Sequence, residues 1–226
     1  MDNSAREYFL SMLDQASCIL LSDPLAESKE ISEYKIQAEM ASSYKSTEKP
    51  CSEDKEAAKD CHRCDKWQNR RMYASPTMHP HPLILFIVPY PEGDRMFSPE
   101  SQDYFFKWQK ALHLEPGEIA LSSIMRCPSS AFDPASADLC KSYLREEMAE
   151  LQPQNLVILS EAASRYMTRC RDEWSSMRRG RAFSINRIPS FCCISPSDLV
   201  MNPALKRDAW VDLKAIARAI GIGNRL

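Results

Sequence analysis

Four cysteines are the residues of this chain whose type and spacing most clearly suggest chemistry. Cys61 and Cys64 form a C-x-x-C pair, a spacing that lets two thiolates reach one metal ion or cluster without strain. Cys127 and Cys140 are separated by a segment that could fold back and bring both sulfurs to one point. Four thiolates would complete a site, but cysteines are also common as small buried core residues. Spacing alone therefore leaves open a metal site and four ordinary core cysteines.

The cysteine count and the amino-terminal residues predict a reducing compartment. Nine cysteines cannot all pair internally, and residues 1–7 lack the basic-then-apolar order of a secretory signal. We therefore expect a cytoplasmic protein with thiols or metal ligands rather than disulfides. No apolar run approaches the roughly 18 residues of a membrane helix, so we expect no membrane association. The remaining cysteines are interpreted as core or surface thiols: Cys18, Cys51, Cys170, Cys192 and Cys193.

Short apolar runs alternate along the chain with segments of helical periodicity. Strands are predicted at 83–88, 119–125, 155–160 and 191–194, and helices at 101–112, 135–151, 161–170 and 203–220. This alternation predicts an α/β fold, a three-layer doubly wound domain with a central four-stranded, mainly parallel sheet. Ligands bind such sheets at the carboxyl ends of the strands. We therefore expect a site in the loops that follow the predicted strands.

The chain divides into three predicted parts with different charge. Residues 1–22 have the apolar periodicity of an amphipathic helix, and 23–60 form a charged, Ser-rich linker that is predicted to be partly disordered. The main domain is predicted to span 61–226. Residues 1–60 hold 7 Lys and Arg against 13 Asp and Glu, whereas the remainder holds 22 against 18. A mildly basic domain is compatible with DNA as a partner, and the acidic leader could engage a protein; we expect a monomer.

The order of these motifs is similar to that of a known family. Over about residues 61–216 the chain resembles the thermophile-type iron–sulfur uracil-DNA glycosylases. The matching features are Cys61 and Cys64, the strand that ends in Pro89-Tyr90-Pro91-Glu92, the segment Ser122-Ser123-Ile124-Met125-Arg126-Cys127-Pro128, Cys140, Arg179-Gly180, and Ser195-Pro196-Ser197. The resemblance implies that Cys61, Cys64, Cys127 and Cys140 ligate a [4Fe-4S] cluster. Zinc is the alternative, because four cysteines also suit a tetrahedral zinc site.

The residues that would perform glycosylase chemistry in that family are replaced here. The resemblance places Pro89 where the family has a catalytic Glu, Ser123 where an Asn reads uracil, and Ser195 where a His stabilises the leaving base. Serine donates one hydrogen bond but cannot become cationic, and proline offers no such group. No residue is therefore assigned a catalytic role, and whether the protein is an enzyme stays open.

Nearby residues offer substitutes for the missing groups. Glu92 or Asp94 could supply a carboxylate, and Tyr90 or Phe97 could stack on a base in the pocket, although solvated loop charges are the simpler interpretation of the two acids. The candidate DNA-binding residues are Arg179, Arg181 and Ser197.

Three functions follow from this reading. The first is a glycosylase-like iron–sulfur protein that binds DNA or a DNA-repair partner, with conventional uracil excision lost or altered, in effect a pseudoenzyme. The second is an active DNA glycosylase with a rebuilt pocket. The third is a non-enzymatic scaffold for protein interactions.

Overall fold

The computed structural model describes residues 60–69 and 79–225. All of them belong to one compact unit, Ser52–Leu226. The helix predicted at 1–22 and almost all of the linker predicted at 23–60 lie outside the described residues, so both stay predictions.

The centre of the domain is a five-stranded sheet. Its strands are β1 (Ile84–Val88), β2 (Ile119–Ser123), β3 (Asn155–Leu159), β4 (Phe183–Ile185) and β5 (Ile188–Cys193). The spatial order is β2-β1-β3-β5-β4, in which the first four strands are parallel and β4 runs antiparallel to β5. The α/β fold with a mainly parallel sheet is thus confirmed, with five described strands where the sequence predicts four.

The additional strand, β4, belongs to a tight hairpin. Ile185 pairs with Ile188, and the two residues between them, Asn186 and Arg187, have positive φ angles of 51° and 66°. This is the backbone of a two-residue turn whose twist matches that of the flanking strands. Such turns usually contain Gly, but here the second position is Arg187. The sequence therefore lacks the usual signature of a hairpin turn at this point.

Helices cover both faces of the sheet. The α-helices among the described residues are α4 (Pro99–Ala111), α5 (Pro134–Leu151), α6 (Glu161–Thr168), α7 (Trp174–Met177), α8 (Pro196–Met201) and α9 (Lys206–Ala219). Short 3-10 turns are η1 (Asp65–Asn69), η2 (Pro116–Glu118), η3 (Pro203–Leu205) and η4 (Gly223–Arg225). None of the helices in these described ranges has the length and apolar character needed to cross a membrane.

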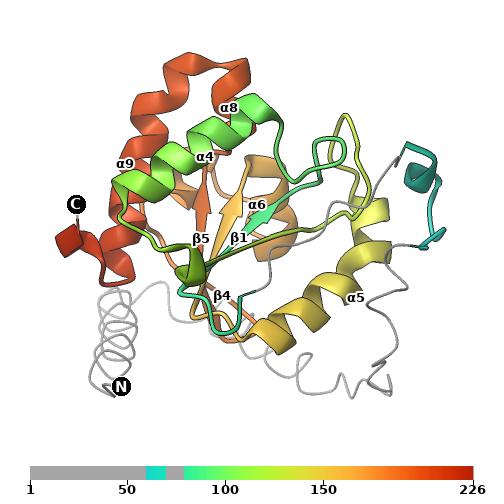
Figure 1. Cartoon of the computed structure of the whole chain (residues 1–226), viewed down its shortest axis with the longest axis horizontal. Helices are drawn as coiled ribbons and strands as arrows, with labels where there is room; N and C mark the ends of the chain where they lie inside the picture. The colour runs from blue at the N-terminus through green and yellow to red at the C-terminus, as the bar shows by residue number, and fades with distance from the viewer. Residues whose placement is uncertain (1–59, 70–78, 226) are drawn as a thin grey trace, which may run out of the picture. The chain divides into compact units, whose positions relative to one another are not determined.

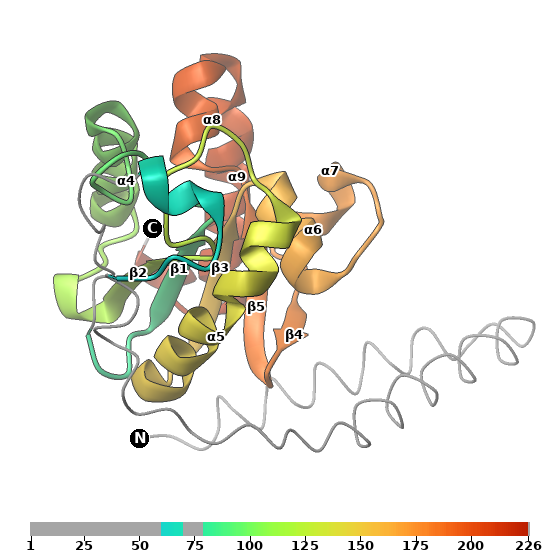
Figure 2. The ribbon, with the colours of Figure 1, turned by 90° about the vertical axis from the view of Figure 1, so that its right-hand side faces the viewer.

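Alternate side chains of the strands bury into two separate cores. Phe86 and Val157 face the core that α4 and α9 close, whereas Leu85 and Ile158 face the core that α5 and α6 close. Figure 1 shows α4 and α9 on one side of the sheet and α5 on the other, and Figure 2 shows α5 and α6 together on their side. Burial on both faces explains why the central strands are continuous apolar runs rather than alternating ones.

The topology produces a reversal at β1. This strand pairs with β2 on one side and with β3 on the other, so successive crossovers leave in opposite directions. A crevice forms at such a point, outside the carboxyl ends of the strands. The loops that follow β1, β3 and β5 therefore lie together, with α8 starting directly after β5 at this edge (Figure 1).

Candidate functional site

A cavity of about 300 Å³ lies at the carboxyl edge of the sheet. Its lining comes from the carboxyl ends of three strands and the segments that follow them, with one residue from the segment before α5. The lining residues are Val88, Pro89, Tyr90 and Glu92 at and after the end of β1, Ser160, Glu161 and Ala162 after β3, Ser195, Ser197 and Asp198 after β5, and Phe132 before α5. The structure thus brings together five residues that the sequence singles out, namely Pro89, Tyr90, Glu92, Ser195 and Ser197.

Glu92 is a fixed carboxylate rather than a solvated loop charge. Its Oε2 accepts hydrogen bonds from the backbone N–H of Ser98 at 2.7 Å and from the hydroxyl of Ser101 at 3.0 Å, and its Oε1 accepts one from the hydroxyl of Ser197. These contacts join the loop after β1 to the first turns of α4 and α8. The position of Glu92 in the cavity is therefore set by two helices.

Ser195 caps α8. Its hydroxyl oxygen accepts hydrogen bonds from the backbone N–H groups of Ser197 at 3.0 Å and Asp198 at 3.4 Å, while Asp198 Oδ2 accepts one from the Ser195 N–H at 3.0 Å. This reciprocal arrangement is a capping box, which satisfies otherwise unpaired donors at a helix start. Because its oxygen is committed to the helix, Ser195 has only its hydroxyl hydrogen left for a ligand.

Ser160 occupies a strained backbone conformation at the cavity. Its φ of 84° and ψ of 154° fall in a region that essentially only glycine adopts, at a cost on the order of 1–3 kcal/mol for other residues. The residue is also the N-cap of α6, and its hydroxyl accepts from the Ala163 N–H at 3.4 Å. Strain of this kind is concentrated at functional sites.

The cavity is lined by three carboxylates, Glu92, Glu161 and Asp198, and the charges of the first two affect the pKa of the third. The pKa of Asp198 is raised above its ordinary value, first by burial and then by the negative charges of Glu161 and Glu92. The pKa of the Tyr90 hydroxyl is also raised, first by burial and then by Glu92 and Asp198. Lys, Arg and His are absent from the described residues that line the cavity. Its interior is therefore acidic.

Two aromatic side chains contribute to the walls. Tyr90 donates a long hydrogen bond of 3.4 Å to the Ser130 carbonyl, and Phe132 packs edge-on against Tyr166 with 5.4 Å between ring centroids. Phe97, the other aromatic residue proposed for a base pocket, instead packs in the core against Phe105 at 5.1 Å and does not line the cavity.

Two further residues from the sequence interpretation also lie away from the cavity lining. Asp94 is exposed on its loop. Ser123, at the end of β2, is fully buried, and its hydroxyl has no hydrogen-bond partner among the described residues.

The C-x-x-C segment lies against α5. Cys61 packs on the buried side chains of Cys140 and Tyr143 of that helix. Between the two cysteines of the pair, Arg63 donates a hydrogen bond to the Ser142 hydroxyl at 3.2 Å, and its guanidinium carbon lies 4.8 Å from the centre of the Tyr143 ring. Cys61 and Cys140, which are far apart in sequence, are thus neighbours.

The surroundings of Cys140 connect it with the other cysteines. The pKa of its thiol is raised, first by burial and further by Cys64 and Cys61, whereas a hydrogen bond from the backbone of Arg126 lowers it. Cys127 is the next residue after Arg126 and is buried. Three of the four predicted ligands therefore lie within electrostatic reach of one another, and the backbone next to the fourth contacts the sulfur of Cys140.

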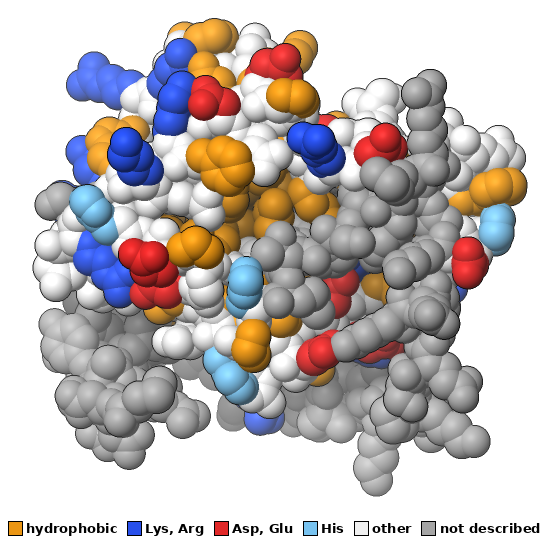
Figure 3. Space-filling model, in the orientation of Figure 1, with side chains coloured by type: hydrophobic (Ala, Val, Ile, Leu, Met, Phe, Trp, Pro, Cys, Tyr) orange, Lys and Arg blue, Asp and Glu red, His pale blue; other side chains and the backbone are white. Residues whose placement is uncertain are grey.

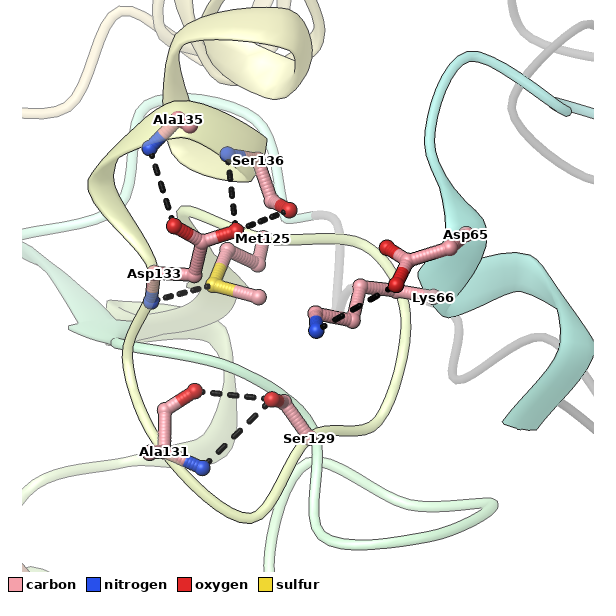
Figure 4. A network of polar contacts seen from close by, with 8 residues as sticks. All are labelled: Asp65, Lys66, Met125, Ser129, Ala131, Asp133, Ala135 and Ser136. Atoms are coloured by element: carbon pink, nitrogen blue, oxygen red, sulfur yellow. Dashed lines mark hydrogen bonds and ion pairs between the residues drawn. The ribbon is translucent and has the colours of Figure 1, made fainter.

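The loop that carries Cys127 is held to the start of α5. Asp133 caps this helix by accepting hydrogen bonds from the N–H groups of Ala135 and Ser136, each at 3.2 Å, and its own N–H donates to Met125 Sδ at 3.4 Å. Figure 4 shows these contacts, with Lys66 of η1 reaching toward the loop. The positive charge of Lys66 contributes to the lowered pKa of Asp133, of which the largest cause is the Ser136 hydroxyl.

The four cysteines predicted as ligands, Cys61, Cys64, Cys127 and Cys140, are not arranged around a common point that would hold a single metal ion. Within residues 60–69 and 79–225, no group of three or more His, Cys, Asp or Glu side chains is arranged to hold a metal ion. The side chains that meet beside α5, Cys61 and Cys140 with Cys64 within electrostatic reach, are nevertheless all thiols, the ligand type that iron–sulfur clusters and zinc prefer.

The arginines proposed for DNA contact are paired with acidic side chains. Arg179 lies 3.1 Å from Asp208 and 3.5 Å from Asp212, and Arg181 lies 2.6 Å from Asp172. On the face shown in Figure 3, the Lys and Arg side chains of the described residues are scattered among acidic ones. The structure does not bring Arg179 or Arg181 to the cavity lining, whereas it does bring Ser197 there.

Four cavity residues with polar or aromatic side chains are not among the site residues predicted from the sequence. They are Phe132, Ser160, Glu161 and Asp198. The sequence carries a signal for three of them: Ser160 is the last residue of a predicted strand, Glu161 directly follows it, and Ser195-x-x-Asp198 has the spacing of a capping box. Phe132 reaches the cavity through a loop whose path has no such signal.

The chain folds as an α/β protein with a cavity at the switch point of a doubly wound sheet. The sequence profile of the uracil DNA glycosylase superfamily matches residues 83–214. The chain therefore belongs to the uracil DNA glycosylase superfamily. No curated protein matches it significantly.

Proposed function

We propose that this chain is an iron–sulfur member of the superfamily that binds DNA and in which conventional excision of uracil is lost or altered. The observation that carries the proposal is the composition of the cavity. The cavity lies at the sheet edge where such folds bind ligands, and it is lined by Pro89 and Ser195, which the resemblance aligns with the family's catalytic residues. It also holds three carboxylates and, among the described lining residues, no Lys, Arg or His.

The chemistry of uracil release explains why this composition opposes conventional activity. Uracil leaves its sugar as an anion, so the pocket must supply donors or positive charge near its oxygens. Ser195 has one hydroxyl hydrogen available, and the carboxylates of Glu92 and Asp198 repel an anion. Loss of one stabilising donor typically costs about 10²–10³ in rate, so the combined replacements leave little uracil excision.

The cluster is proposed on the four thiols beside α5. Cys61, Cys64, Cys127 and Cys140 would hold a [4Fe-4S] cluster, which when bound would cross-link the C-x-x-C segment to the main domain through iron–thiolate bonds. Zinc would need all four sulfurs about 2.3 Å from one centre. The order of the four cysteines and their neighbouring motifs, which resembles that of the iron–sulfur glycosylases, favours the cluster over zinc.

DNA binding is proposed from the superfamily and from the mildly basic main domain, not from a continuous basic patch. Arg179 and Arg181 would have to exchange their acidic partners for phosphates, so we expect binding of moderate strength that weakens steeply with salt. A protein partner for residues 1–60 stays a prediction, since these residues lie almost entirely outside the described part of the chain.

Three measurements test the proposal. The first is binding of the full chain to undamaged duplex DNA at increasing salt, where binding at 50 mM salt that is lost at higher salt is expected. The second is excision from a uracil-containing duplex, where no abasic product is expected. Absence of DNA binding at low salt would overturn the DNA-binding part and leave a protein-interaction scaffold, and rapid uracil excision would overturn the loss of activity.

The third measurement is the iron, sulfide and zinc content of protein purified without oxygen. Cys140→Ser should abolish the iron signal, whereas Cys170→Ser, a matched change at a partly buried cysteine outside the proposed set, should retain it. Stoichiometric zinc without sulfide would contradict the cluster.

A restoration experiment tests the cavity directly. Pro89→Glu combined with Ser195→His places the two family side chains at positions that line the cavity. Some uracil excision should return. Ser123→Asn is left out of this variant, because Ser123 is fully buried and a larger side chain there would overpack the end of β2.

A further inference from the structure

Glu92, Glu161 and Asp198 line the cavity from three different segments, the loop after β1 and the first turns of α6 and α8. Their convergence is therefore a product of the fold and not of one acidic stretch of sequence.

Two of the three carboxylates are not neutralised by a basic side chain. Glu161 pairs with Arg165 of α6, with 2.8 Å between Oε1 and Nη2. Among the ion pairs of the described residues, none includes Glu92 or Asp198. The cavity therefore carries negative charge that the surrounding protein does not cancel.

Acceptor atoms also remain available to a ligand. Asp198 uses Oδ2 for the capping box, and no described residue donates a hydrogen bond to its Oδ1. Glu161 likewise binds Arg165 through Oε1 alone. A ligand that fits this cavity has to present hydrogen-bond donors or positive charge, because carboxylate oxygens only accept hydrogen bonds. The edge of uracil, with two carbonyl acceptors around one N–H donor, offers mostly the opposite pattern.

The size and walls of the cavity suit a flat, base-sized ligand. A volume of about 300 Å³ is at the lower end for small-molecule sites. The aromatic rings of Tyr90 and Phe132 offer π-faces, and such faces attract cations as well as stack on bases.

We propose that the cavity receives a positively charged nucleobase flipped out of duplex DNA, that is, an N-alkylated purine. This inference rests on the proposed function, since it requires that the chain bind DNA. The carboxylates recognise the charge of the base, the free acceptors take its amino hydrogens, and the aromatic walls stack on its ring. A base that is already cationic does not leave its sugar as an anion, so it needs no positively charged donor at position 195. The serine at this position, where the resemblance places a histidine, is therefore consistent with an acidic cavity that binds a cationic base.

The test is a binding comparison with the full chain. Duplexes of one sequence carry a single N7-methylguanine, a guanine or a uracil at the same position, with 2′-fluorination of the sugar so that the glycosidic bond survives the measurement. The wild-type protein should bind the methylguanine duplex about tenfold more tightly than the guanine duplex, the effect expected of one unit charge about 4 Å from a carboxylate when the effective dielectric constant is about 60, close to that of water. The uracil duplex should bind no better than the guanine duplex.

Matched variants separate the cavity from general charge. Glu161→Gln removes one cavity carboxylate and one i,i+4 ion pair, and Asp103→Asn removes one carboxylate and the equivalent helix pair with Lys107 on α4, outside the cavity. The preference for methylguanine should fall severalfold in Glu161→Gln and stay unchanged in Asp103→Asn.

The outcomes distinguish this inference from the function on which it rests. Equal binding of all three duplexes, with normal salt dependence, would overturn the cationic-base inference and leave the proposed DNA binding intact. Preference for uracil would do the same. Failure to bind any duplex at low salt would overturn the DNA-binding proposal itself. An equal loss of preference in both variants would show that overall charge, and not the cavity, selects the base, and would also overturn the inference.

Discussion

Replacing Arg178 by Met should destabilise the domain far more than the same change at its neighbour Arg179. Arg178 is 7% exposed, and its Nη1 lies 2.9 Å from Oδ2 of Asp212, which is fully buried. Removing one partner of a buried ion pair costs about 3–5 kcal/mol, because the other charge stays buried. Arg179 still lies 3.5 Å from Asp212 Oδ1 in this variant, which partly compensates and favours the lower end, about 3 kcal/mol.

The neighbouring substitution provides the control. Arg179 is 40% exposed, and its closest contact is with Asp208, itself 46% exposed. Pairs of this kind are worth about 0.2–1 kcal/mol, so Arg179→Met should cost at most about 1 kcal/mol. The double variant Arg178→Met with Asp212→Leu, which replaces the buried pair with apolar side chains, should recover most of the loss.

Urea unfolding followed by circular dichroism measures these differences. With a slope of about 2–3 kcal/mol per molar urea, the midpoint for Arg178→Met should fall by about 1–1.5 M, and that for Arg179→Met by less than about 0.5 M. Equal shifts for the two variants, or no recovery in the double variant, would refute the interpretation of Arg178 and Asp212 as a mutually dependent buried pair.

Three further results are expected. Ser160→Gly should leave stability unchanged or raise it by up to about 1 kcal/mol, because the relief of positive-φ strain offsets the weaker helix cap; a clear loss in thermal unfolding would contradict the strain. Asp198→Asn should flatten the pH dependence of stability. The pKa of Asp198 is raised in the folded protein, so ionisation of this side chain destabilises the fold as the pH rises from 3.8 through the folded pKa, and the penalty is absent below that window. The urea midpoint should therefore fall more between pH 3 and 7 in the wild type than in the variant. Glu147→Gln should destabilise the protein by about 3 kcal/mol in the same assay, because it leaves Arg126, 1% exposed and 2.8 Å from Glu147, without a charged partner.

The sequence was sufficient to predict the parallel core of the fold. Buried central strands are continuous apolar runs, so β1 and β3 are recognisable without any tertiary information. The hairpin strand β4 was missed, because three residues and a turn at Asn186 and Arg187 give neither a periodic pattern nor a turn signature. The short helix α8 was missed for a similar reason: six residues do not complete two turns.

The site was only partly predictable for a different reason. Residues next to a predicted strand end, such as Glu92 and Ser195, could be placed at the ligand edge by the rule for parallel sheets. An aromatic residue in such a loop can face either the cavity or the core. The sequence does not indicate that Tyr90 lines the cavity whereas Phe97 packs in the core. The acidic character of the cavity was also hidden, because it depends on Asp198 meeting side chains from two other loops.

The hairpin formed by β4 affects how this molecule can meet other chains. A parallel sheet that ended at β5 would expose a row of unpaired main-chain donors and acceptors, the usual template for strand addition and aggregation. β4 covers that margin and becomes the edge strand, but with three residues it is too short to offer a foreign strand a continuous row of partners. This margin of the sheet is consequently a poor docking place for a foreign strand, and contacts made there have to rely on side chains.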